Sequence, residues 1–216
     1  MLERTFFQRD PLTCARELIG CELIWNECAG IIVETEAYAA IGDEAAHTFA
    51  RPSARAFVAE RQPGAAYVYF NYGMYWLLNV LVKGGAEDGF VLFRAIEPTR
   101  GIPEMQRRRG IGRKVPLTKV SALCSGPGKL TLALGIDGRD HGRDLCTGSI
   151  VGFRTPPQPV DAVPDVRVGI SKAADRPWRF VAPDSAFVSF AAGRVRPHPG
   201  KRLTTNAAGD RLSKER

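Results

Sequence analysis

The chain has 216 residues, 44% of them hydrophobic and 25% charged, so it is long enough to bury a core and is expected to form one domain. A formal net charge of +7 favours an anionic partner, which charge alone leaves open between DNA, ribosomes and membrane surfaces. The apolar run from Met74 to Val82 is too short to span a bilayer, and charges near Met1 argue against a secretory signal, so a soluble, cytoplasmic protein is expected.

The first predicted element is a short helix that follows Asp10. Asp10 is a good N-cap, Pro11 suits the first helical position, and Gly20 ends the helical pattern. The apolar face of this helix comprises Leu12, Ala15, Leu18 and Ile19. We expect this face to pack on a sheet.

Two strands are predicted next, over residues 21–25 and 31–38, joined by a polar turn. In the second strand, a period of two assigns its side chains to two faces. One face carries Ile32, Glu34, Glu36 and Tyr38, and the other carries Ile31, Val33, Thr35 and Ala37. We therefore expect Glu36 and Tyr38 to point the same way.

Residues 66–71, 75–82 and 89–96 are rich in aromatic and β-branched side chains, which predicts three consecutive strands in an antiparallel meander. Residues 97–119 break this pattern with prolines, glycines and the basic run 107–114, and they are predicted to form a solvated loop.

A second helix is predicted after Ser125, with its stop at Gly135. Further strands are predicted over residues 150–154, 166–170, 179–181 and 187–190. We divide the chain into a domain over residues 1–200 and a polar C-terminal tail over 201–216.

The five cysteines favour neither disulfides nor a metal site. Their number is odd and no two of them form a CxxC pair, so we expect reduced and mostly buried thiols. They are Cys14, Cys21, Cys28, Cys124 and Cys146. No metal and no cofactor are expected.

The candidate chemistry starts from Glu36, in the motif over residues 33–38. Hydrolysis of an N-glycosidic bond needs a water, a carboxylate to accept its proton, and negative charge beside an oxocarbenium-like sugar. One glutamate can serve both needs. The alternative is that Glu34 and Glu36 are merely ion-pair partners of nearby arginines.

Several rings could hold a purine taken out of a duplex. Tyr38, His47 and Tyr69 are candidate walls of such a pocket, and each stacked ring contributes about 1 to 3 kcal/mol. Tyrosines at strand spacing are also ordinary cross-strand partners, and a lone histidine is often structural. The clustering of the rings, rather than any one of them, favours the pocket.

The ordered motifs resemble those of the alkyladenine (3-methyladenine) DNA glycosylase family, and the chain is similar to a bacterial-type member of that family. The resemblance extends from about Leu12 to about Phe190. It rests on residues 33–38, 43–47, 67–75 with Asn79, 94–98 and 125–130. It implies a single mixed α+β domain with a curved antiparallel sheet flanked by helices, which agrees with the predicted meander.

The resemblance also implies roles for individual residues. Glu36 would be the general base, and Arg94 would help to hold its water. The flipped base would lie between Tyr38 on one side and His47 with Tyr69 on the other.

Further roles follow at the DNA surface. Tyr72 corresponds to the intercalating tyrosine of the family, with Met74 beside the same wedge. Asn79 corresponds to the asparagine that crowds the exocyclic amino group of a normal guanine. The segment from Arg55 to Arg61 departs from the family pattern, in which the arginine is followed by asparagine, and Asn71 replaces a common hydrophobic residue. We interpret Arg55–Arg61 as a loop that grips DNA differently.

Phosphate contacts are expected from Lys129 at the start of its helix, and from some of Arg51, Arg55, Lys83 and the basic run 107–114. If about six phosphates are neutralised, log affinity falls with log salt at a slope of roughly minus five. The basic run could instead be a solvated loop without DNA contacts.

The leading hypothesis is a monofunctional DNA glycosylase that repairs double-stranded DNA by hydrolysing the bond to alkylated purines. We expect a monomer with no membrane partner. The alternatives are a non-catalytic binder of distorted or abasic DNA and, more weakly, a hydrolase of free nucleosides, which would leave Tyr72 and the basic surface unexplained.

Overall fold

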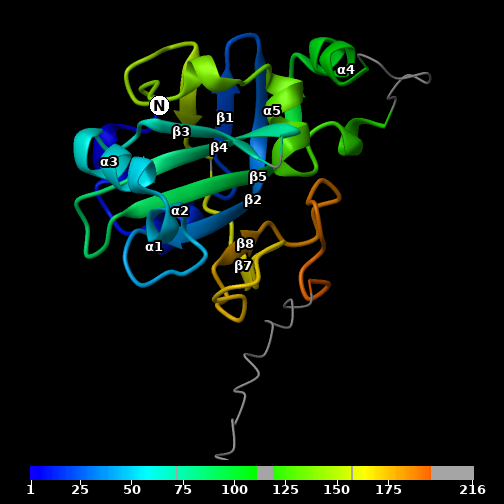
Figure 1. Cartoon of the computed structure of the whole chain (residues 1–216). Coiled ribbons are helices and arrows are strands. Elements are labelled where there is room, and N and C mark those ends of the chain that lie inside the picture. The colour runs from blue at the N-terminus through cyan, green and yellow to red at the C-terminus, as the bar shows by residue number, and fades with distance from the viewer. Residues whose placement is uncertain (72, 111–118, 157, 196–216) are drawn as a thin grey trace, which may run out of the picture.

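The computed structural model describes residues 1–71, 73–110, 119–156 and 158–195 (Figure 1). The α-helices are α1 (Pro11–Glu17), α2 (His47–Ala50), α3 (Pro52–Glu60), α4 (Ile102–Gly110) and α5 (Pro127–Leu134). The strands are β1 (Glu22–Trp25), β2 (Cys28–Ala39), β3 (Ala66–Asn71), β4 (Tyr75–Val82), β5 (Gly89–Arg100), β6 (Val151–Arg154), β7 (Val163–Asp165) and β8 (Arg179–Val181). Short 3-10 helices cover Arg4–Phe7, Val120–Ala122 and Gly138–Asp140.

The strands form one curled antiparallel sheet in the order β3-β4-β5-β2-β1-β6, and β8 joins β2 and β7. The predicted meander is confirmed, and β3 and β4 have the predicted bounds. The prediction of a single α+β domain with a curved antiparallel sheet is likewise confirmed. The division at residue 200 stays a prediction, because residues 196–216 lie outside the described residues.

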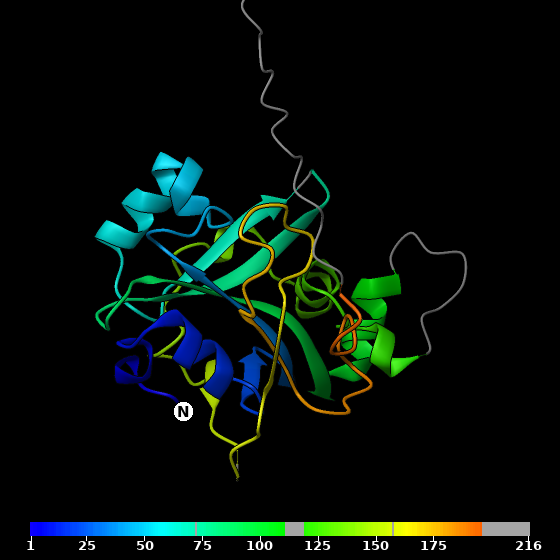
Figure 2. The same ribbon diagram turned by 90° about the horizontal axis from the view of Figure 1, so that it is seen from below.

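The sheet has one core face and one site face. On the core face, α1 and α5 cover alternate residues of β3, β4 and β5, including Val68, Val80 and Phe93. On the site face, Phe57 of α3 packs against Tyr67 and other residues of a smaller apolar cluster. Figure 2 shows α1 on one side of the sheet and α2 with α3 on the other.

The predicted helix after Asp10 is confirmed in type and position. The Asp10 Oδ1 atom accepts the Thr13 backbone N–H at 2.9 Å, and Pro11 is the first helical residue. The second predicted helix is also confirmed, and it ends at Gly135, whose φ of 73° is the left-handed conformation of a helix C-cap.

A β-bulge in β2 corrects part of the predicted face assignment. In a regular strand, residues an odd number of positions apart lie on opposite faces. The register to β5 shifts between Ile32 and Glu34, and Ile32 therefore lies in the core cluster together with Ala37. The prediction that Ile32 shares a face with Glu34 is therefore wrong. The prediction that Glu36 and Tyr38 point the same way is confirmed, because both line one cavity.

The prediction of a loop over residues 97–119 is wrong where the structure describes it. β5 continues to Arg100, and α4 follows. Arg108 of α4 pairs with Glu104 and Glu27, and it donates to the Leu134 carbonyl oxygen at 2.8 Å. This part of the basic run therefore ties α4 to α5, while residues 111–118 lie outside the described residues.

Other local predictions are also corrected. Residues 166–170 and 187–190 are not strands, and β7 lies just before the first of these segments. The Arg55–Arg61 segment, interpreted as a loop, is mostly helix α3. Lys83, a candidate phosphate donor, instead contacts the end of α3, where its Nζ donates to the Val58 carbonyl oxygen at 2.8 Å.

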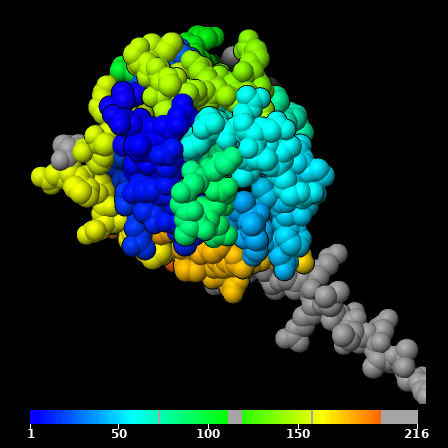
Figure 3. All heavy atoms as spheres, turned by 90° about the vertical axis from the view of Figure 1, so that its left-hand side faces the viewer, coloured from blue at the N-terminus to red at the C-terminus, as the bar shows by residue number. Residues whose placement is uncertain are grey.

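The N-terminal segment and α3 flank the loop between β4 and β5, and Figure 3 shows all three on one face. The Lys83 backbone N–H donates to the Phe7 carbonyl oxygen at 3.0 Å, which ties this loop to the N-terminal segment.

The cysteines are free and mostly buried, as predicted, and burial raises the pKa of Cys14 to about 12, which keeps it a thiol. None of the helices in the described residues is long and apolar enough to cross a membrane.

Candidate active site

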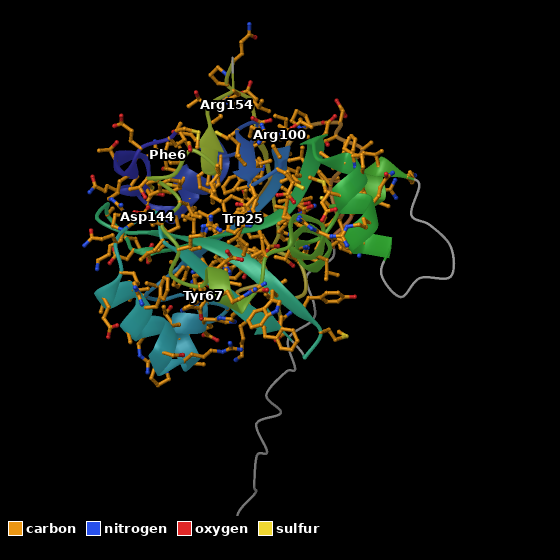
Figure 4. All side chains as sticks on the ribbon, turned by 90° about the horizontal axis from the view of Figure 1, so that it is seen from above. Phe6, Trp25, Tyr67, Arg100, Asp144 and Arg154 are labelled. Atoms are coloured by element: carbon orange, nitrogen blue, oxygen red, sulfur yellow. The ribbon has the colours of Figure 1, made fainter. Side chains whose placement is uncertain are left out.

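A cavity of about 390 Å³ opens on the site face of the sheet. This volume lies within the range of small-ligand sites. It brings together six residues predicted from the sequence, namely Glu36, Tyr38, His47, Tyr69, Asn79 and Arg94. In Figure 4, the neighbouring ring of Tyr67 lies beside α2 and α3.

Glu36 has no exposed side-chain surface, yet it lines the cavity. Its Oε2 accepts the Tyr38 hydroxyl at 2.7 Å, and its Oε1 accepts the Val168 backbone N–H at 2.7 Å. The guanidinium of Arg94 lies 3.3 Å from the same Oε1. Burial, with the nearby Glu36 carboxylate, raises the pKa of Tyr38 well above 10, so this hydroxyl keeps its proton.

Glu34, two positions earlier in β2, is a hub of buried ion pairs. Its Oε1 accepts the Nε–H groups of Arg94 and Arg179, each at 2.8 Å. Ser189 donates its backbone N–H to the Glu34 Oε2 at 2.6 Å. Burial alone would raise the pKa of Glu34, but the two guanidiniums lower it below 4.5. Glu34 is thus an ion-pair partner that holds Arg94 in place, and Glu36 also pairs with Arg94, at 3.3 Å, while it lines the cavity.

Burial alone would lower the pKa of Arg94, but Glu36 and Glu34 raise it above its usual value, so Arg94 stays charged. The surrounding network adds the pairs Arg179–Asp165 and Arg167–Asp43. Four carboxylates thus face three guanidiniums beneath the cavity, and Arg51 in the cavity wall adds a fourth guanidinium, so these charges balance.

The remaining walls are aromatic or amide groups. The ring centroids of His47 and Tyr69 are 4.2 Å apart at an interplanar angle of 62°. The His47 Nδ1 lies 3.1 Å from the Tyr67 hydroxyl. Asn79 of β4 is 4% exposed, and its Nδ2 donates to the Tyr67 carbonyl oxygen at 3.1 Å. These contacts fix the rings before any ligand binds.

His47 is neutral at physiological pH. Burial, with a smaller contribution from the Arg51 charge, lowers the pKa of His47 from 6.5 to about 4. A neutral imidazole does not repel a cationic ligand.

We expect His47 to weaken the fold in mild acid. The unfolded chain takes up a proton at this histidine below pH 6.5 and the folded chain only near pH 4, so stability falls as the pH drops through this window. His47→Gln should therefore lose less stability than the wild type between pH 7 and pH 4.5 in urea unfolding. An equal loss in both proteins would show that His47 is not held neutral.

The predicted DNA-binding residues lie outside the cavity or outside the described residues. Met74 is 64% exposed, Lys129 is exposed, and Arg55 is exposed on α3 with its guanidinium on the Thr48 carbonyl oxygen. None of these three lines the cavity. Tyr72 lies outside the described residues.

Sequence reasoning missed two features of the site. Val168 supplies a backbone donor to Glu36 from 132 positions along the chain, in a segment predicted as a strand. Arg51, considered only as a phosphate contact, lines the cavity. The contact from Val168 leaves no local pattern in the sequence that could reveal it.

Comparison with known proteins places the chain among DNA-repair enzymes. The methylpurine-DNA glycosylase family profile matches residues 5–186. A Rhodopseudomonas palustris protein named "Putative 3-methyladenine DNA glycosylase" is 44% identical over 189 residues, which cover 88% of each chain. A Rhizobium etli protein of the same name is 44% identical over 188 residues, which cover 86% of this chain and 87% of the relative.

The match spans the whole described site, from Glu34 and Glu36 in β2 to Arg179 in β8. Most of the length of both relatives is thus matched by this chain, and the resemblance found in its motifs is confirmed. The chain belongs to the methylpurine-DNA glycosylase family of DNA-repair hydrolases.

Proposed function

We propose that this chain excises alkylated purines, of which 3-methyladenine is one, after turning them out of double-stranded DNA. Glu36 activates the water that replaces the base. The observation that carries this proposal is the position of Glu36, whose carboxylate lines a ring-walled cavity while Tyr38, Val168 and Arg94 hold it.

The carboxylate has room for one more donor. Its Oε1 faces both Val168 and Arg94, whereas its Oε2 accepts only the Tyr38 hydroxyl among the donors of the described residues. A carboxylate has about four acceptor directions. The remaining direction on Oε2 suits a water that donates one proton to Glu36.

In the reaction, the water oxygen bonds to C1′ of the deoxyribose and its proton passes to Glu36. The N-glycosidic bond breaks, and its electron pair stays with the purine. A purine alkylated at N3 or N7 carries a positive charge, so it leaves as a neutral base and needs no general acid. The Glu36 carboxylate stabilises the oxocarbenium-like sugar that forms between these events.

Base flipping costs a few kcal/mol, which stacking against the cavity rings offsets. We place the flipped purine between Tyr38 and the pair His47 and Tyr69, with Asn79 crowding the amino group of a normal guanine. Phe70 lines the cavity, and Phe70, Met74 and Tyr75 are exposed apolar side chains of the β3–β4 hairpin that suit a wedge in the minor groove. Tyr72 stays proposed as the residue that fills the vacated stack.

The test is base release from duplexes that carry one defined lesion, with 3-methyladenine or 7-methylguanine as the substrate. We expect free base and an abasic site that breaks only on alkali treatment, since the proposed mechanism forms no covalent intermediate. Binding without base release would favour the non-catalytic alternative. Release from free nucleosides as fast as from duplexes would favour the nucleoside hydrolase.

Lys129 is proposed to contact a phosphate, because it is exposed at the start of α5 and Pro127 of the same helix lines the cavity. Lys129→Met should weaken binding of all duplexes and reduce the slope of log affinity against log salt by about one. Arg154→Met is the control, since Arg154 lies at the end of the molecule opposite Tyr67 (Figure 4). Equal salt slopes in the wild type and in Lys129→Met would remove Lys129 from the DNA interface.

A further inference from the structure

A buried arginine contacts the ring of Tyr38. The guanidinium carbon of Arg167 lies 4.6 Å from the centroid of the Tyr38 ring and 5.1 Å from that of Trp178. Of the described residues, Tyr38 lines the cavity and Arg167 does not. Arg167 therefore supports the tyrosine from outside the cavity.

Asp43 neutralises this guanidinium. Its two carboxylate oxygens accept from Arg167 NH1 at 2.5 Å and from NH2 at 2.9 Å, and both side chains are fully buried. The Arg167 Nε–H is also buried but has no hydrogen-bond partner among the described residues. The guanidinium of Arg167 thus binds Asp43 through its two terminal nitrogens and contacts the Tyr38 ring with its flat face, while its Nε–H stays without a partner among the described residues.

Arg167 also anchors the backbone that holds Glu36. Its NH1 donates to the Ala37 carbonyl oxygen of β2 at 3.1 Å, and the next residue, Val168, donates its backbone N–H to Glu36. A shift of Arg167 would therefore move a ring of the cavity and a donor to the Glu36 carboxylate together. A guanidinium offers a fixed fork and a flat face, which an ammonium cannot reproduce.

We propose that Arg167 is a positioning residue for Tyr38 and Val168, and that Asp43 makes the site tolerant of cationic bases by cancelling the Arg167 charge. Without Asp43, the guanidinium would repel a cationic alkylpurine stacked on Tyr38 but not a neutral purine of similar size. This inference rests on the proposed function, since it concerns how the same cavity discriminates between lesions.

The test compares Asp43→Asn with the wild type on two duplexes, one with cationic 7-methylguanine and one with neutral hypoxanthine. The ratio of single-turnover release rates, 7-methylguanine over hypoxanthine, should fall by about tenfold or more, because an unpaired buried charge is weakly screened. If hypoxanthine is not released, duplex affinities measured in a Glu36→Gln background give the same ratio. A merely structural role for Asp43 would slow both reactions alike and leave the ratio unchanged, which would overturn the proposal.

Arg167→Lys tests the positioning role of Arg167 separately from the effect of its charge. It keeps the charge and the Asp43 partner but loses the fork and the flat face, so both rates should fall at least about fivefold while their ratio stays within about twofold. Unchanged rates in Arg167→Lys would overturn the positioning role. Asp144→Asn is the matched control, since it makes the same chemical change at a carboxylate that accepts from Arg4 at 2.6 Å and does not line the cavity.

Folding of each variant is checked by thermal melting. If Asp43→Asn does not fold, the double variant Asp43→Leu with Arg167→Met removes both charges, and its ratio should match the wild type while both rates fall. A changed ratio in the double variant would contradict the charge argument. A wild-type protein that releases neither base would instead defeat the proposed function, so the two failures are distinguishable.

Discussion

Glu36→Gln should lower the single-turnover rate of base release by about a thousandfold or more, while the variant still folds and binds damaged duplexes. A positioned general base contributes about 100-fold to 10,000-fold, and the lost charge beside the oxocarbenium-like sugar adds to this. Glutamine retains a carbonyl oxygen for Val168 and Arg94, and the Tyr38 hydroxyl can turn to accept from its amide. The expected loss is therefore in chemistry and not in structure.

The measurement is release of 7-methylguanine from a single-lesion duplex with enzyme in excess, together with duplex affinity and a thermal melt. His47→Gln serves as a control for a change elsewhere in the cavity that leaves Glu36 intact. Base release by Glu36→Gln within about tenfold of the wild type would be too fast for a lost general base. In that case the assignment of Glu36 would be wrong, whatever the affinity shows.

The sequence was most informative where local periodicity and the site coincide. Glu36 and Tyr38 share a face because the register shifts of β2 lie before Thr35, so the period of two holds from Thr35 to Tyr38. Tyr69 and Asn79 come from a hairpin whose strand bounds were predicted correctly. Periodicity assigned residues to strands and faces, and the family resemblance implied that Glu36, Tyr38, Tyr69 and Asn79 share one site.

Contacts over long distances in the chain could not be predicted in the same way. Asp43 and Arg167 are 124 positions apart, and no periodicity links an arginine after β7 to an aspartate before α2. The arginines of α4 were mistaken for a solvated run because composition does not show that Glu104 and Glu27 neutralise Arg108. The loop interpretation of Arg55–Arg61 rests on its departure from the family motif, and a missing motif residue does not show that the segment is helical.

Glu34→Gln provides the complementary result, a loss of stability. Glu34 lies two positions before Glu36 in the same strand and is equally buried. Both pair with Arg94, but Glu34 also binds Arg179 and Ser189. Removing one member of a buried ion-pair network leaves uncompensated charge and costs about 3 to 5 kcal/mol. For a chain of this size, this corresponds to a drop in melting temperature of roughly 10 °C.

The pH dependence gives Glu34→Gln a second signature. Since the folded pKa of Glu34 is lowered below 4.5, its contribution to stability is present above pH 4.5 and is lost as the pH falls through the lower folded value. The variant should therefore start less stable at pH 7 and lose less stability than the wild type on acidification. Urea unfolding at pH 7 and in steps below pH 4.5 measures both effects. If the stability of the variant and of the wild type fell in parallel on acidification, or if Glu34→Gln and Glu36→Gln melted at the same temperature, Glu34 would not have the stabilising role that its contacts indicate.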